Sequence, residues 1–243
     1  MEWNDQGLVL SIKRHGESSA VIHLLTRSHG RHAGLVRGIA SRNMRGSLQI
    51  GNKVSATWRG RLAENLGSYT VESDVAYAAR LLDSPIALEA LNTICALALL
   101  LLPEREPHET IFDGLDLVLE AFSHEDIWPA LLVRWEVGLL QELGFALDLE
   151  KCAVTGQTHD LTHVSPRTGR AVSRYEAAPY KERLLRLPGF LTHDERESSA
   201  LPTPDDIQDG FRLSGHFLST RALAPQAQAL PPCRERMLER LYR

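Results

Sequence analysis

The sequence predicts an α+β protein in which a small β-barrel comes first and an all-helical region follows. Short β-forming segments separated by Gly- and Ser-containing turns run to about residue 77. Beyond about residue 79, apolar residues recur at helical spacing, and one hairpin pattern interrupts them. We therefore expect a β-domain over residues 1–78, a helical domain over 79–148 and 178–243, and an insertion over 149–177.

The N-terminal part of the chain contains five predicted strands. They are expected over residues 7–13, 20–26, 32–37, 53–58 and 69–75. Turn signals separate them, among them Gly16-Glu17-Ser18-Ser19 and Ser28-His29-Gly30-Arg31. Five short strands within about 75 residues are typical of an OB-fold barrel. An SH3-like barrel is the alternative.

The remainder of the chain is dominated by helical patterns. Helices are predicted over residues 85–102, 108–122, 126–143, 177–187, 204–220 and 232–241. Pro85 suits the first turn of its helix. In the third helix one face carries an apolar stripe, formed by Trp128, Leu131, Leu132, Trp135, Leu139 and Leu143. Between the third and fourth helices, residues 161–164 and 170–174 read as a hairpin around the turn Pro166-Arg167-Thr168-Gly169.

Composition favours a cytoplasmic protein. No apolar run approaches the roughly 20 residues that a membrane span needs, and the polar start Met1-Glu2-Trp3-Asn4-Asp5 does not fit a secretory signal. The chain has three widely spaced cysteines, Cys95, Cys152 and Cys233. Such a set favours free thiols in a reducing compartment.

The net charge of −4 hides a segregation of charge along the chain. Residues 1–61 hold ten Lys/Arg against three acids, a net charge of +7, while the remaining residues carry −11. A segregated basic region indicates either a polyanion-binding surface or a solvated charged face.

The basic region combines cations with an aromatic residue on predicted strands. Arginine and lysine neutralise phosphates, and an aromatic ring can stack on unpaired bases. Trp58 alternates with Val54 and Ala56, so it is either such a ring or a core residue. The candidate DNA-binding residues are Lys13, Arg14, Arg37, Arg42, Arg45, Lys53, Trp58 and Arg59.

Catalytic motifs are absent from the sequence. There is no phosphate-binding loop ending in Lys-Ser/Thr, no dinucleotide fingerprint, no His-Glu-x-x-His and no nucleophile elbow. We therefore expect neither an enzyme nor a cofactor. Two other classes of function stay open: a scaffold whose barrel binds protein, and a nuclease. A nuclease needs clustered carboxylates for metal ions, and residues 1–61 offer three acids.

Several stretches resemble the RecO family in order and spacing. They are Trp3-Asn4-Asp5-Gln6-Gly7-Leu8-Val9-Leu10, Gly16-Glu17-Ser18-Ser19-Ala20-Val21-Ile22, residues 26–38, residues 141–149, Cys152, and Val164-Ser165-Pro166-Arg167-Thr168-Gly169. The resemblance covers most of the chain and fades after about residue 190.

The resemblance implies an OB-fold followed by a helical domain with a small zinc-ribbon-like insertion. It also implies a recombination mediator, nucleoid-associated in a bacterial cytoplasm, that binds single- and double-stranded DNA and anneals complementary strands. The partners it implies are RecR and the acidic C-terminal tail of single-stranded DNA-binding protein. Recognition of this tail is implied to help RecA load.

Two further expectations concern the helical part and its insertion. Many RecO relatives carry two Cys-x-x-Cys pairs, but here Thr155, Ser173 and Glu176 stand where Cys152 would need partners, so we predict no metal site. His159 and His163 are the alternative partners of Cys152, but their spacing suits a helix and they fall in a predicted loop and strand. Arg134 lies about 100° from the centre of its helix's apolar face. It is either the cation that receives an acidic tail or an ordinary exposed arginine.

Overall fold

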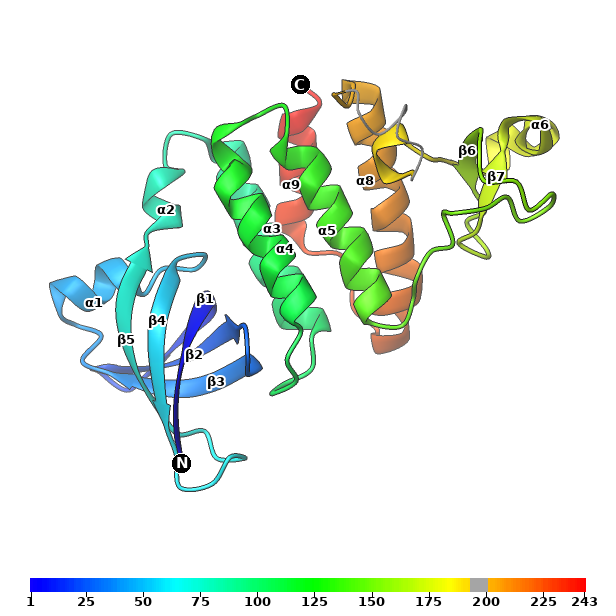
Figure 1. Ribbon diagram of the computed structural model, residues 1–243. Helices are drawn as coiled ribbons and strands as arrows, with labels where there is room; N and C mark the ends of the chain where they lie inside the picture. Colours follow the sequence, from blue (N-terminus) through cyan, green and yellow to red (C-terminus); the bar gives the residue numbers. More distant parts are fainter. Residues whose placement is uncertain (193–200) are drawn as a thin grey trace. The chain divides into compact units, whose positions relative to one another are not determined.

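The computed structural model describes residues 1–192 and 201–243, without the side chains of Arg42, Asn43 and Arg45. The chain forms two compact units (Figure 1). The first comprises Met1–Asp113 and Pro231–Arg243, and the second comprises Gly114–Leu230.

The first unit contains a closed five-stranded barrel in the order β1-β2-β3-β5-β4. Its strands are β1 (Glu2–His15), β2 (Ser19–Thr26), β3 (Gly30–Arg37), β4 (Lys53–Arg59) and β5 (Ser68–Val75). The 14-residue β1 pairs antiparallel with both β2 and β4, and this double pairing closes the ring. β3 meets β5 in the one parallel pairing described. The predicted OB-type barrel followed by helices is therefore confirmed.

The interior of the barrel is apolar because alternate residues of each strand point inward. The core consists of Val9, Ala20, Ile22, Leu24, Val36, Leu48, Val54, Ala56, Trp58, Tyr69 and Val71. The short helix α1 (Arg42–Ser47) packs against it through Met44. Ser41 caps this helix by accepting a hydrogen bond from the Met44 amide, at 3.3 Å. The sequence patterns had not predicted α1.

Helices complete the first unit. They are α2 (Tyr77–Arg80), α3 (Pro85–Leu101), the start of α4 (Glu109–Glu120) and α9 (Pro232–Leu241). The Cys95 thiol of α3 lies 3.7 Å from the Val9 carbonyl oxygen of β1. α9 packs on α3, and two hydrogen bonds of 2.8 and 2.9 Å join Arg236 to Glu89.

The second unit is built on α5 (Trp128–Glu142) and α8 (Pro204–Phe217), with the turn η1 (Ala121–Ser123) before them. The π-helix η4 (Leu218–Leu223) and the 3-10 turn η5 (Ala224–Gln226) follow α8. The predicted apolar face of α5 is buried through Trp128, Leu132, Trp135 and Leu139. The Ser214 hydroxyl donates to the buried Glu136 carboxylate, so a polar contact also joins the two helices. No helix among the described residues is long and apolar enough to cross a membrane.

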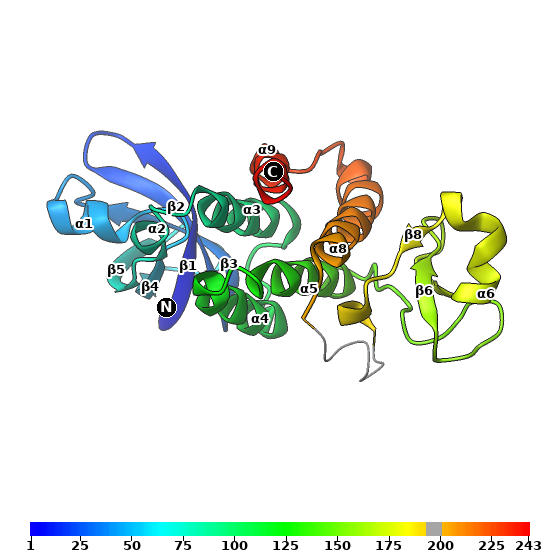
Figure 2. The same ribbon diagram turned by 90° about the horizontal axis from the view of Figure 1, so that it is seen from above.

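The insertion forms a three-stranded sheet in the order β7-β6-β8. Figure 2 shows β6 and β8 of this sheet together with α6. The predicted hairpin is present as β6 (Leu161–Val164) and β7 (Ala171–Ser173). The helix expected over 177–187 was wrong. That stretch contains the end of α6 (Arg174–Ala177), the 3-10 turn η2 (Ala178–Arg183) and β8 (Leu185–Arg186), with η3 (Gly189–Leu191) beyond. Pro179 interrupts helical hydrogen bonding, and β8 pairs with the other edge of β6.

Candidate nucleic-acid interface

Three of the predicted cations gather at one end of the β1-β2-β3 sheet. Lys13 and Arg14 pair with Val21 and Ala20, and Arg37 pairs with Ser19. Neighbouring strands lie about 5 Å apart, so the three residues lie close together at this end of the sheet, with the consecutive Lys13 and Arg14 on opposite faces of β1. All three are exposed, and no carboxylate in the described part of the chain forms an ion pair with them.

Helix α1 begins at the same end of the barrel. The Ile39 amide donates to the Ser18 carbonyl oxygen at 3.1 Å, which attaches the segment before α1 to the β1–β2 turn. Arg42 and Arg45 belong to α1, but their side chains lie outside the described residues. We call Lys13, Arg14, Arg37 and helix α1 the basic end.

Arg59 and Lys53 lie elsewhere on the barrel. The Arg59 guanidinium is 2.8 Å from the Glu2 carboxylate, and this hydrogen bond holds the pKa of Glu2 below its usual value. Lys53 stands at the opposite end of β4, with its Nζ 5.5 Å from the centre of the Phe112 ring. Both positive charges are therefore committed to contacts within the first unit.

Trp58 is a core residue and not a stacking platform. Its side chain is 1% exposed, and its indole nitrogen donates to the Leu66 carbonyl oxygen at 3.1 Å. The loop after β4 closes tightly over the ring: a Cβ at Gly67 would lie 2.4 Å from the indole, and Gly67 has a φ of +60°. We therefore remove Trp58 from the proposed DNA-binding set.

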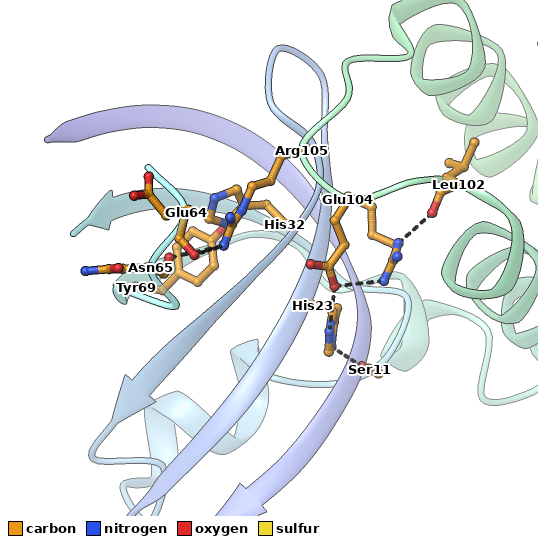
Figure 3. Close-up of polar contacts among 10 residues, drawn as sticks. Ser11, His23, His32, Glu64, Asn65, Tyr69, Leu102, Glu104 and Arg105 are labelled. Carbon is orange, nitrogen blue, oxygen red and sulfur yellow. Dashed lines mark hydrogen bonds and ion pairs between the residues drawn. The ribbon is translucent and has the colours of Figure 1, made fainter. Parts of the chain in front are cut away.

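The segment that follows α3 lies against the barrel and engages other cations (Figure 3). Arg31 donates to the Leu102 carbonyl oxygen at 2.7 Å and to Glu104 at 3.2 Å. Arg105, at a φ of +63°, donates to the carbonyl oxygens of Glu64 and Asn65. Its guanidinium thus fixes the β4–β5 loop.

These contacts change how the basic charge is distributed. Arg27 lies 2.7 Å from Glu109 and 2.8 Å from Asp113, so acids that follow the basic region in sequence fold back onto it. The net charge of residues 1–61 therefore overstates the charge available to a ligand. Sequence reasoning missed this because the pairing acids belong to residues 104–113. The available charge is concentrated at the basic end.

Arg134 lies beside a hollow of about 620 Å³ in the second unit. Its guanidinium donates two hydrogen bonds, of 3.0 and 2.7 Å, to the Phe190 carbonyl oxygen. Part of the lining of the hollow is apolar and is formed by Val137, Leu147, Leu149, Phe190 and Leu191. Asp148 and Glu150 also line it, so its charge is mixed.

Cys152 sits where a zinc ligand would stand, but hydrogen bonds surround its sulfur. The side chain is buried, and the Ser173 amide donates to Sγ at 3.3 Å. Burial alone would raise the pKa of this thiol, but hydrogen bonds from Ser173 and Thr155 outweigh it and lower the pKa to about 6. Within the described residues, no group of three or more His, Cys, Asp or Glu side chains is placed to hold a metal ion.

Comparison with known proteins agrees with this architecture. A family model described as "Recombination protein O N terminal" matches residues 1–76, and one described as "Recombination protein O C terminal" matches residues 82–227. A "DNA repair protein RecO" from Rhodopseudomonas palustris strain TIE-1 is 50% identical over 229 residues, covering 94% of this chain and 91% of the relative. Proteins of the same name from Bradyrhizobium diazoefficiens and Rhodospirillum rubrum are 49% and 45% identical, covering all of this chain and 96% and 97% of theirs. The chain belongs to the RecO family of DNA repair and recombination proteins.

Proposed function

We propose that this protein is a non-enzymatic recombination mediator that binds single- and double-stranded DNA through the basic end of its barrel. It anneals complementary strands and, together with RecR, assists the loading of RecA. The observation that carries the proposal is the clustering of Lys13, Arg14 and Arg37 without carboxylate partners among the described residues. Family membership supports the role in repair.

The proposed mechanism is electrostatic. Cations at the basic end replace counterions on the phosphate backbone, and the release of those counterions drives binding. With Trp58 buried, this surface holds a strand mainly by its backbone and leaves the bases open to pair with a second strand.

Binding to labelled oligo(dT), measured by fluorescence anisotropy across a salt series, tests the site. Replacing Lys13, Arg14 and Arg37 together with Ala should weaken binding and flatten the slope of log K against log salt by about 2, since each phosphate contact on a single strand contributes about 0.7. Arg59→Ala is the matched control, because that arginine is exposed but already paired with Glu2. An unchanged slope in the triple variant would move the DNA site elsewhere.

The same salt series separates the mediator from the alternative, an OB-fold scaffold without direct DNA function. A phosphate-binding protein loses affinity steeply as salt rises, whereas a protein-binding scaffold shows no oligonucleotide binding at all. Co-elution with purified RecR in size-exclusion chromatography tests the proposed partnership, and separate elution at micromolar concentrations would contradict it.

We further propose that the Arg134 hollow receives the acidic, apolar-ended tail of single-stranded DNA-binding protein. An apolar lining beside a guanidinium supports this, because such a tail needs both a pocket and a cation. Titration of a labelled tail peptide should show weaker binding to Arg134→Glu than to the parent. Arg212→Glu is the control, since Arg212 is an exposed cation on α8 that does not line the hollow. Equal affinity of the Arg134 variant and the parent rejects the assignment.

A further inference from the structure

The insertion in the second unit exposes two aromatic rings close together in sequence. Tyr175 of α6 is 85% exposed and Tyr180 of η2 is 60% exposed. The core of the small sheet is filled without them, by the buried side chains of Leu161, Val164, Ala171 and Val172. The two tyrosines therefore contribute little to the core of the insertion, and their rings are open to a ligand.

The insertion that carries these rings is also rich in cations. Residues 149–187 hold seven Lys/Arg against four acids, whereas residues 62–243 as a whole carry a net charge of −11. Lys181 and Arg183 are exposed and have no ion-pair partner among the residues that the structure describes. Arg174 is paired with Asp160 at 2.9 Å, and Arg186 lies 3.7 Å from Asp209.

Some of these charges act on the buried His163 of β6. It pairs in register with Arg186 across β6 and β8. Burial lowers the pKa of His163, and the positive charges of Arg186, Lys181 and Arg174 lower it further. Its side chain is buried, and its Nε2 has no hydrogen-bond partner in the described structure. Three cations, from α6, η2 and β8, thus contribute positive charge at one buried imidazole.

We infer that Tyr175, Tyr180, Lys181 and Arg183 form a second nucleic-acid surface, which binds a single strand by stacking its bases on the tyrosines and its phosphates against the cations. Exposed rings can stack only on bases that are not already paired, so this surface favours single strands over duplexes. An acidic peptide fits less well, because rings that stand out into solvent do not form a pocket for apolar side chains. The inference does not depend on DNA binding at the basic end.

Affinity for oligo(dT) by anisotropy is the first measurement. Replacing both tyrosines with Ala should weaken binding at least about fivefold, whereas replacing both with Phe, which keeps the rings, should leave it unchanged. Lys181→Ala with Arg183→Ala should flatten the salt slope by about 1.4. Arg212→Ala is the matched control for an exposed cation of the second unit.

Photo-cross-linking of oligo(dT) carrying 5-iodouracil, followed by mass spectrometry, is the second measurement. The expected cross-link is to a peptide containing Tyr175 or Tyr180. Excess unlabelled oligo(dT) should abolish this cross-link, whereas an acidic peptide competitor should not. Unchanged affinity of the double Ala variant together with cross-links confined to residues 1–75 would overturn the inference. The reverse pattern, with the Lys13, Arg14 and Arg37 variant unaffected, would instead overturn the barrel site and leave this one standing.

Discussion

The barrel and the insertion are both small β-structures, but different forces stabilise them. The barrel has five strands in a closed ring and an apolar core of eleven buried residues. The insertion has strands of four, three and two residues, and its sheet is held partly by hydrogen bonds that converge on the Cys152 sulfur. The difference shows that a short sheet can keep its form through local polar contacts where it cannot bury a large core.

The largest expected effect follows from removing a ring from the barrel core. Trp58→Ala should lower the free energy of unfolding by about 3–5 kcal/mol, because it leaves a cavity where a large aromatic side chain was. Urea denaturation followed by circular dichroism measures the loss. Leu62→Ala, at a side chain that is 50% exposed, is the control and should change stability by less than about 1 kcal/mol. Equal losses in the two variants would contradict the assignment of Trp58 to the core.

A smaller effect concerns the response of the barrel to acid. Burial, with a further contribution from the charge of Arg105, lowers the pKa of His32 to about 4, while an unfolded chain has a histidine pKa near 6.5. As pH falls from 6.5 towards 4, His32 binds a proton in the unfolded state but stays unprotonated in the folded state. Stability should therefore fall over this range, by about 2 kcal/mol, and be fully present above pH 6.5.

The measurement is urea denaturation at a series of pH values. His32→Gln should flatten the decrease between pH 6.5 and 4, whereas His15→Gln, at an exposed position, should not. A decrease of the same steepness in His32→Gln and the parent would show that other groups cause the acid sensitivity.

In the insertion, loss of the Cys152 sulfur should have a local effect. Cys152→Ala leaves the Ser173 amide buried without its acceptor, which costs about 1–2 kcal/mol. Faster hydrogen exchange at Ser173 and its neighbours in β7 should report this, with the barrel amides unchanged. Val154→Ala, at a 67% exposed side chain, is the control. Slowed or unchanged exchange at Ser173 would contradict a supporting role for the sulfur.

The smallest expected effect is that of removing metal. Since hydrogen bonds already surround the Cys152 thiol and hydroxyl groups stand at two of the other ligand positions, treatment with a chelator should leave the melting temperature unchanged. Elemental analysis of protein purified without added metal should find no stoichiometric zinc. About one zinc per chain, lost in Cys152→Ser, would show that the insertion binds metal after all.

Much of the fold could be predicted because long periodic patterns specify it. The five strands and the long helices α3, α5 and α8 were recognisable from alternation and from apolar spacing. The elements that were missed, α1, α2 and β8, have between two and six residues, too few to establish a period. β8 exists because β6 offers it an open edge, which is a property of the folded chain and not of the local sequence.

The candidate site was harder to predict because the sequence shows how many charged residues there are but not which of them form ion pairs in the folded chain. Lys13, Arg14 and Arg37 were chosen for the same reason as Arg59, yet Glu2 neutralises Arg59 through a register that only barrel closure creates. Trp58 was left open between stacking and core, and the tight loop at Gly67 decides for the core. The exposed tyrosines of the insertion carried no signal, because Tyr180 fell within a helix expected over residues 177–187 and Tyr175 lay between that helix and the predicted hairpin.

The packing of α9 on α3 has a consequence for how the protein is made. Residues 102–231 separate the two helices, and most of that stretch, residues 114–230, forms a unit of its own. During translation the barrel and α3 leave the ribosome long before α9 is synthesised, so the surface of α3 that α9 covers stays uncovered in the meantime. The first unit of this chain is therefore among the earliest parts to begin folding and the last to finish, and truncation before residue 231 would remove a structural part of the barrel's own unit.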